Sequence, residues 1–226
     1  AYQARRMEVY AAMAEAMDFH IGRLMAHLKE TGEYDNTVFV FMSDNGAEAS
    51  DPYALAVGRW WLDQNYNRDI DRLGSKGAYS VIGPHWARAA TAPLNTYKFF
   101  AGEGGIRVPG IVRWPGVIPA GRVTEQAAIT MDWTATVLDM AQAQLPAGHV
   151  LDGVSMKPTL QDVHKTFERP MFWRMKYKQQ RAHRDGDWKY LQVDDHEYLF
   201  NLSEDARERA NQAQRHPDKF KAMRAA

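Results

Sequence analysis

The sequence lacks cysteine, an excess of charge of either sign and any long apolar run. Without cysteine, its 226 residues can form neither disulfides nor thiolate metal sites, and they offer no cysteine nucleophile. Lys and Arg together number 28, as do Asp and Glu, so the charge balance gives no indication of a nucleic-acid or anionic-membrane partner. Because no stretch of about 18 apolar residues occurs, the sequence predicts no transmembrane helix.

Apolar side chains are plentiful enough for a folded core. They make up 45% of the residues, so we do not expect disorder, and the length suits one large domain or a domain with a smaller appendage. The N-terminus does not begin with Met and has no signal-peptide pattern; it opens directly into a helical pattern. We therefore expect a chain cut from a longer one, with bacterial periplasm and cytoplasm both open as compartments.

A long helix followed by an apolar strand dominates the first part of the chain. From Tyr2 to about Thr31, apolar residues recur at spacings of three and four, which predicts an amphipathic helix that Gly32 ends. Thr37-Val-Phe-Val-Phe-Met42 then predicts a strand covered on both faces. Helix, short loop and buried strand form half of a βαβ unit. The predicted class is α/β, with a mixed or mostly parallel sheet sandwiched by helices.

The middle of the chain begins with a long excursion over residues 47–96, which shows no strong periodicity. Trp60 and Trp61 predict one short helix within it, and the aromatic content argues against disorder. A long segment of this kind in a compact domain favours a loop that lines the mouth of an active site.

Shorter elements are expected after the excursion. Residues 111–114 predict one short strand, and residues 117–130 predict another with a turn. Asp132 is a candidate N-cap for a helix over residues 133–143, with Val137 on its inward face.

The character of the sequence changes after about residue 165. Short aromatic runs separated by turns, with a hairpin signal at Asp185-Gly186, predict a small antiparallel sheet. The charged tail over residues 203–226 predicts a helix or two packed on that sheet. We therefore divide the chain into an α/β part of a catalytic domain, residues 1–160, and a small C-terminal α+β subdomain, residues 161–226.

Ser43-Asp44-Asn45-Gly46 directly follows the apolar strand, where open α/β sheets place their ligands. A carboxylate next to an amide oxygen suits a hard cation such as Ca²⁺ or Mg²⁺. Asp-Asn-Gly is also a common turn sequence, so these residues alone leave metal binding and a plain turn open. Lys98 leaves a similar choice between a cation aimed at an anionic substrate and a solvated side chain.

A set of motifs occurs along the chain in a fixed order. They are Phe41-Met-Ser-Asp-Asn-Gly46, Thr91-Ala-Pro93, Lys98, Gly104-Gly-Ile-Arg-Val-Pro109, Asp185-Gly-Asp-Trp-Lys-Tyr-Leu191 and Glu197-Tyr-Leu-Phe-Asn-Leu202. This ordered set resembles the sulfatases of the alkaline-phosphatase superfamily, the bacterial arylsulfatases above all, and covers nearly the whole chain. The resemblance implies an arylsulfatase-like sulfuric ester hydrolase.

Residue by residue, the resemblance implies that Asp44 and Asn45 are ligands of an active-site Ca²⁺, with Mg²⁺ also possible. It implies that Lys98 contacts the sulfate group and the leaving oxygen of a small-molecule sulfate ester. A divalent cation and an ammonium group would stabilise the negative charge that builds on the leaving oxygen. The tryptophans Trp60, Trp61 and Trp86 suggest an aryl or other bulky leaving group.

Two features that the resemblance implies are absent from the sequence, the pair of aspartates that follows the family's first strand and the nucleophile. The resemblance implies a formylglycine nucleophile made from Cys or Ser in a Cys/Ser-x-Pro-x-Arg motif, and this chain contains no such motif. We therefore expect the C-terminal half of a sulfatase, completed by an N-terminal half and inactive alone, because the covalent step needs a nucleophile. A phosphonate or phosphodiester hydrolase of the same superfamily and a non-catalytic binding module remain as alternatives.

Overall fold

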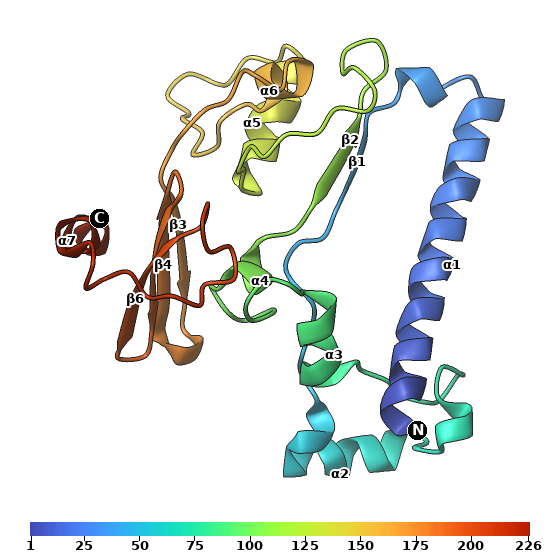
Figure 1. Ribbon diagram of the computed structural model, residues 1–226. Coiled ribbons are helices and arrows are strands. Elements are labelled where there is room, and N and C mark those ends of the chain that lie inside the picture. The colour runs from blue at the N-terminus through green and yellow to red at the C-terminus, as the bar shows by residue number, and fades with distance from the viewer.

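The computed structural model describes residues 1–226 and opens with one long helix, α1 (Tyr2–Glu30), as predicted. The helix ends where the Thr31 hydroxyl donates to the carbonyl oxygens of His27 and Leu28, and Gly32 follows at φ +80°. Arg6 is its one buried residue, since its guanidinium pairs with Asp51 at 2.7 Å. The helix therefore runs as an exposed bar along one side of the molecule (Figure 1).

Strand β1 (Phe39–Met42) pairs with β2 (Gly110–Arg113), and the pairing is antiparallel with Phe41 opposite Ile111. The prediction of a strand covered on both faces is wrong for this chain. Val40 and Phe41 stay 43% and 47% exposed, because β1 has a single neighbouring strand to pack against. The one partner strand of β1 runs antiparallel, whereas the sequence predicted a mixed or mostly parallel sheet.

The long excursion is more ordered than the sequence indicates. It contains helices α2 (Ala56–Asn65) and α3 (Gly83–Ala90), with short 3-10 helices at Pro52–Ala54 and Ile70–Arg72. Helix α2 accounts for the predicted short helix. Helix α3 was not predicted, because Pro84 reads as a chain breaker although proline is well tolerated in the first turn of a helix.

Between the two sheets lie α4 (Glu103–Ile106), α5 (Met131–Met140) and α6 (Lys157–Gln161). The strand predicted over residues 117–130 is absent, because these residues form turns and irregular backbone. Val137 is 55% exposed, so its predicted inward position is also wrong.

Asp132 is buried at the start of α5. The N-cap residue is Thr130, so the prediction that Asp132 is the N-cap is wrong. The Asp132 carboxylate accepts hydrogen bonds from the backbone N–H groups of Ile129 at 2.8 Å and Val154 at 2.9 Å. It also pairs with Arg169 at 2.7 Å. This carboxylate therefore ties three segments together instead of capping one helix.

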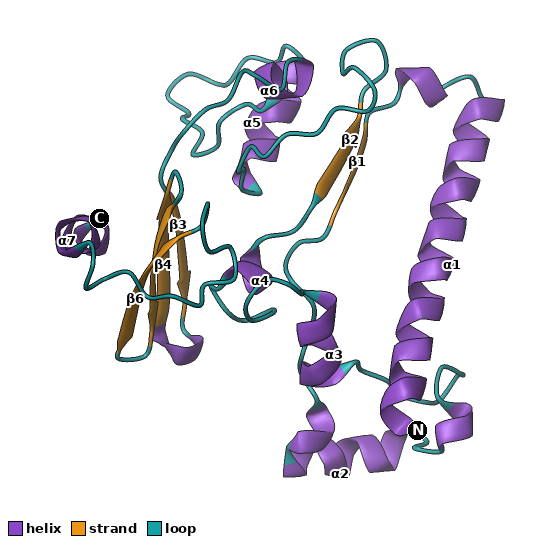
Figure 2. Cartoon of the chain, in the orientation of Figure 1, coloured by secondary structure: helices purple, strands orange, loops and turns teal.

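The C-terminal sheet matches its prediction and has the order β3-β4-β5-β6, with every neighbouring pair antiparallel (Figure 2). Gly186, at φ +57°, lies in the tight turn between β4 and β5. The strands are β3 (Met171–Met175), β4 (Gln180–Asp185), β5 (Trp188–Val193) and β6 (His196–Asn201).

Each face of this sheet has its own core. One face packs Ala182, Leu191 and Phe200 against Ala101, which precedes α4. The other face is partly covered by α7 (Pro217–Ala225) through Met223. The α/β class with a small C-terminal antiparallel sheet and a packed helix is thus confirmed. The domain boundary at residue 160 stays a prediction. None of the helices is long and apolar enough to cross a membrane.

Candidate functional site

Two loops and the start of α4 meet beyond the end of β1, and these three segments contain all the residues predicted for the site. These are residues 43–48, 95–98 and 102–105. Their backbones are joined by hydrogen bonds from Gly46 N to Gly105 O at 3.0 Å, from Lys98 N to Ala47 O at 3.1 Å and from Gly104 N to Asn95 O at 2.6 Å. We call this meeting point of the three segments the glycine junction.

Glycine is required at the junction because the backbones touch. A Cβ atom on Gly46 would overlap the carbonyl group of Gly104, and one on Gly105 would overlap the carbonyl oxygen of Phe100. Each contact would be with backbone atoms, which cannot turn away as a flexible side chain could. The three segments can therefore hold this arrangement only with glycine at these positions.

Asp44 and Asn45 lie at the start of the junction, directly after β1. Asp44 is exposed and Asn45 is partly buried, and the Ser43 hydroxyl donates to the Asn45 carbonyl oxygen at 2.8 Å. Asp44 lies close enough to Lys98 for its charge to help raise the pKa of the ammonium group. The structure thus places the loop that contains Asp44 and Asn45 beside Lys98.

Glu48 is a site residue that the sequence reasoning missed. Its carboxylate lies 2.7 Å from Lys98 Nζ, so Lys98 is ion-paired and not simply solvated. The hydrogen bond to Glu48 raises the pKa of Lys98, and the negative charges of Glu48 and Asp44 add to the effect. The sequence signal that could have identified Glu48 is its carboxylate, which lies in the same short loop as Asp44 and Asn45.

The same ion pair lowers the pKa of Glu48. Its partial burial raises the pKa of the carboxyl, but hydrogen bonds from Lys98 and Ser50 outweigh burial and hold the pKa below its ordinary value. Both groups therefore stay charged at neutral pH, and the ammonium group remains close to Asp44.

A buried ion cluster anchors the junction to the C-terminal sheet. Lys189 of β5 lies 2.7 Å from Glu103 Oε1 and 2.8 Å from Glu208 Oε1, and none of the three residues is more than 5% exposed. The Glu103 backbone N–H also donates to Glu208 Oε2 at 2.7 Å. Burial raises the pKa of Glu208, although the charge of Lys189 opposes it. This cluster, which we call the lysine clamp, fixes α4 and the glycines beside it.

The side chains of the junction are of the kind that binds Ca²⁺, but there are too few of them to complete a Ca²⁺ site. Asp44 and Asn45 supply hard oxygen donors, which suit Ca²⁺ and Mg²⁺. No group of three or more His, Asp or Glu side chains in the structure could hold a metal ion. Two oxygen-bearing side chains fall short of the six to eight ligands that Ca²⁺ takes, so these residues fit as part of a site.

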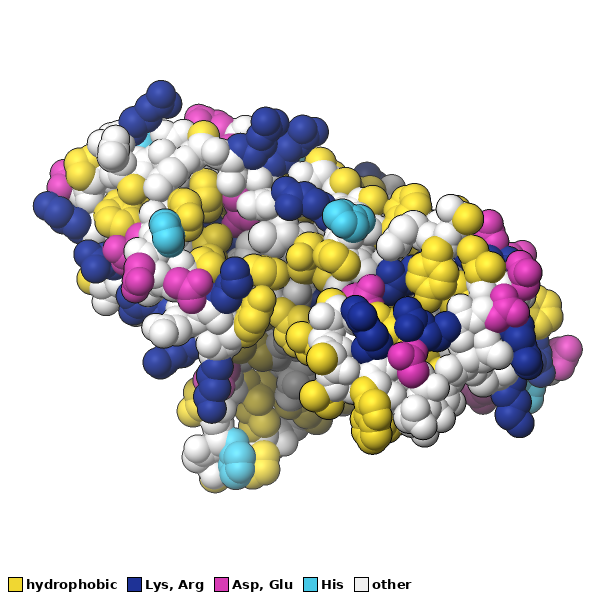
Figure 3. All heavy atoms as spheres, turned by 90° about the horizontal axis from the view of Figure 1, so that it is seen from below, with side chains coloured by type: hydrophobic (Ala, Val, Ile, Leu, Met, Phe, Trp, Pro, Cys, Tyr) yellow, Lys and Arg dark blue, Asp and Glu magenta, His cyan; other side chains and the backbone are white.

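The aromatic residues noted in the sequence lie in different surroundings. Trp86 packs on a small core of Ala49, Ile82 and Ala87, which Tyr97 also contacts just before Lys98. Trp60 and Trp61 lie on α2 and are 66% and 49% exposed. Helix α2 lies at the lower end of the molecule in Figure 1, and Figure 3 shows the molecule from that end. Hydrophobic side chains are visible there among Lys and Arg (Figure 3). Whether they line the mouth of an active site stays a prediction.

Comparison with known families places the chain. The sulfatase family model matches residues 1–143, and the model of the C-terminal region of N-sulphoglucosamine sulphohydrolase matches residues 97–222. The chain belongs to the sulfatase family.

Similar proteins agree with this placement. An uncharacterized sulfatase of Schizosaccharomyces pombe is 38% identical over 234 residues, which cover 96% of this chain and 42% of the relative. An arylsulfatase of Klebsiella aerogenes is 36% identical over 142 residues, or 62% of this chain and 30% of the relative. The crystal structure of Ps i-CgsB matches with a TM-score of 0.68 at 28% identity, covering 95% of this chain and 40% of that one. The chain therefore spans less than half the length of each.

Proposed function

We propose that this chain supplies part of the catalytic site of an arylsulfatase-like sulfuric ester hydrolase. The observation that carries the proposal is the glycine junction, which places the Lys98 ammonium group beside the loop of Asp44 and Asn45. In this proposal Lys98 contacts the sulfate group and the leaving oxygen, while Asp44 and Asn45 ligate Ca²⁺, or Mg²⁺ in its place.

Lys98 suits this role because its charge is secured before substrate binds. The ion pair with Glu48 raises the pKa of Lys98, so the ammonium group stays protonated well above neutral pH. A sulfate ester carries one negative charge, and its oxygens would compete with Glu48 for the ammonium hydrogens. Negative charge grows on the leaving oxygen as the S–O bond breaks, and a fixed cation stabilises it most in that state. A bound Ca²⁺ would supply further positive charge to the sulfate oxygens.

We further propose that the nucleophile, a formylglycine, comes from an N-terminal half of the same protein. Three observations support this part. The chain contains no cysteine and spans 42% of the length of its S. pombe relative. Large apolar side chains of α1, including Met13 and Phe19, are 68% and 65% exposed and suit a surface that other residues cover. The 226 residues alone would then not turn over substrate.

The test is an assay of the complete reading frame and of this chain with 4-nitrophenyl sulfate. We expect activity from the former, none from the latter, and a fall in kcat of roughly 100-fold or more for Lys98→Ala in the complete protein. Lys176→Ala, at an exposed lysine of the C-terminal part, should leave kcat unchanged. Turnover by the isolated chain would contradict the assignment of the nucleophile, and full activity of Lys98→Ala would contradict the site.

Two further readouts separate the remaining functions. Inhibition of the complete protein by sulfate more than by phosphate supports sulfate esters, and the reverse supports a phosphonate or phosphodiester hydrolase. If the frame before Ala1 lacks both Asp-Asp after a strand and Cys/Ser-x-Pro-x-Arg, the chain belongs to a non-catalytic binding protein instead.

A further inference from the structure

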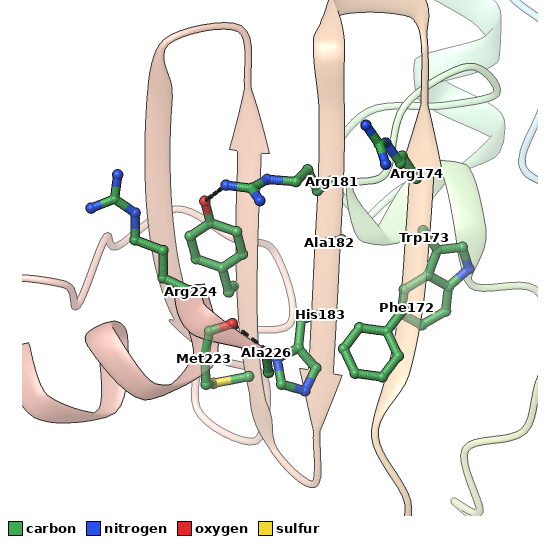
Figure 4. A pocket seen from close by; sticks show the side chains of 10 residues that line it. Phe172, Trp173, Arg174, Arg181, Ala182, His183, Met223, Arg224 and Ala226 are labelled. Carbon is green, nitrogen blue, oxygen red and sulfur yellow. Dashed lines mark hydrogen bonds between the residues drawn. The ribbon is translucent and has the colours of Figure 1, made fainter.

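The C-terminal sheet carries a pocket on the face opposite to Ala101 and α4. Helix α7 covers this face over β5 and β6 and reaches His183 of β4 through Met223, but it leaves the rest of β4 and β3 open. A pocket of about 220 Å³ remains there, between the sheet and the last residues of α7 (Figure 4). Its main lining residues are Phe172, Arg174, Arg181, His183, Tyr190 and Met223.

Two positively charged side chains, Arg174 and Arg181, lie at one end of the pocket, and the Arg181 guanidinium points toward Tyr190 (Figure 4). Arg174 and Arg181 are directly opposite in the register of β3 and β4, a placement of like charges that costs stability in a sheet. The guanidinium of Arg181 bonds to the neutral groups Gln192 Oε1 at 2.7 Å and Tyr190 Oη at 3.5 Å. The carboxylates of this face are already paired, Glu197 with Arg224 at 2.9 Å and Asp185 with Lys219 at 3.9 Å. A pair of guanidiniums without a carboxylate partner is suited to bind an acid group.

The other end of the pocket holds a polar atom without a partner. His183 is 8% exposed, and its Nδ1 lies 3.0 Å from the carbonyl oxygen of Met223. Because a carbonyl oxygen only accepts, Nδ1 carries the hydrogen, and Nε2 of the neutral ring is left as an acceptor. Nε2 is buried and has no hydrogen-bond partner. Buried polar atoms are rarely left unpaired, so this nitrogen is suited to accept from a ligand hydroxyl.

The wall of the pocket beside His183 is flat and apolar. Phe172 stacks on the His183 ring with centroids 4.4 Å apart and planes at 19°, yet it remains 51% exposed. Arg181 and His183 are two residues apart on one strand, so their Cα atoms are separated by about 7 Å along the sheet. That separation and the small volume limit the ligand to about one ring.

We propose that this pocket binds a single-ring aromatic acid that carries a hydroxyl group opposite its carboxylate. The carboxylate lies between Arg174 and Arg181, the ring packs on Phe172, and the hydroxyl donates to His183 Nε2. This inference is independent of the proposed function, since it uses none of the glycine junction residues.

The test is a titration of the ¹⁵N-labelled 226-residue chain with 4-hydroxybenzoate, followed by amide and imidazole NMR shifts. Saturable shifts at Phe172, Arg181 and the His183 ring are expected. Benzoate should bind about fivefold more weakly, because the bond to Nε2 is lost, and phenol about tenfold more weakly, because the acid is lost.

Substitutions identify the groups that make the contact. Arg174→Gln, at an exposed strand position that tolerates polar residues, should raise Kd about tenfold. Arg215→Gln, at an exposed arginine without a side-chain bond, should leave Kd within about twofold of the parent value. Amide shifts away from the pocket report that each variant is folded.

Three results would overturn the proposal. They are the absence of saturable shifts, equal losses for Arg174→Gln and Arg215→Gln, or sodium sulfate giving the same shifts at the same midpoint, which would show an adventitious ion only.

Discussion

The two ends of the chain differ sharply in how they bury their apolar residues. The C-terminal sheet has a core on each face, with Leu191 and Leu199 at 6% and 0% exposed. Helix α1 is the longest element of the molecule and buries Arg6 alone. Both regions carry many large apolar side chains, so composition does not explain the difference.

Connectivity explains it instead. The strands of the C-terminal sheet pair in chain order, so each strand finds its neighbour within a few residues and the hairpins bring their own core together. Strand β1 pairs with β2, which begins almost seventy residues later, and α1 has no helix or sheet laid along it (Figure 1). The N-terminal part therefore depends on distant contacts, some of which we propose lie in the remainder of a sulfatase.

The largest effect is expected for Lys189→Met in the lysine clamp. The variant leaves the buried carboxylate of Glu208 without a cation and that of Glu103 with only Arg184 at 3.9 Å, which should lower the free energy of unfolding by about 3–5 kcal/mol. Urea denaturation followed by tryptophan fluorescence measures the loss. Lys219→Met, whose partner Asp185 is 3.9 Å away at the surface, should cost less than about 1 kcal/mol. Equal losses in the two variants would show that the buried lysine clamp stabilises the fold no more than a surface ion pair does.

Met223→Ala tests the self-contained core of the C-terminal sheet. Met223 is 3% exposed and packs on Tyr190 and Leu199, so the cavity should cost about 2–4 kcal/mol. Met13→Ala, at 68% exposure on α1, should change the free energy of unfolding by less than about 0.5 kcal/mol. Thermal or urea unfolding measures both, and similar losses would remove the contrast between the two regions.

Gly46→Ala tests the glycine junction that lies between the two regions. The added methyl group meets the Gly104 carbonyl, and moving these backbones apart should cost about 1–3 kcal/mol. Gly110→Ala on β2, where a Cβ meets no atom within 4 Å, is the matched control and should be close to neutral. Differential scanning calorimetry of the two variants gives the comparison. A neutral Gly46→Ala would mean that the segments are not in contact as described.

The smallest effect is a pH dependence that Glu208 creates in the C-terminal region. Burial raises the pKa of Glu208 above its ordinary value of 4.5, so the folded chain keeps a proton that the unfolded chain has released. Glu208 therefore makes stability fall as pH rises from 4.5 through the raised pKa. Urea midpoints measured across this range should change less in Glu208→Gln than in the exposed control Glu204→Gln. Parallel profiles for the two variants would rule out this contribution.

The contrast between local contacts in the C-terminal sheet and distant contacts in the N-terminal part also explains which features the sequence could predict. The helix of α1, the turn at Gly186 and the strands of the C-terminal sheet depend on spacing and turn chemistry within short windows, and they were predicted closely. The burial of β1 was predicted wrongly, because a short apolar run does not reveal what covers it in a given chain.

The candidate site was predicted in part, for a related reason. Asp44, Asn45 and Lys98 came from motifs, and the glycine junction brings their loops together. Glu48 and the lysine clamp were missed, because the pairing of Lys189 with Glu103 joins residues 86 positions apart. No local pattern marks such a pair, since buried charges find their partners only in the folded chain.

The lysine clamp also bears on how this protein can be divided. Glu103 belongs to α4, next to the glycines that support the Asp44 loop, but its cation is on β5 of the C-terminal sheet. A truncated chain that ends after α6 would keep every residue of the glycine junction and would leave Glu103 without its counter-ion. The C-terminal sheet is therefore a structural requirement of the junction, and the smallest unit that can hold the Asp44 loop in place includes both.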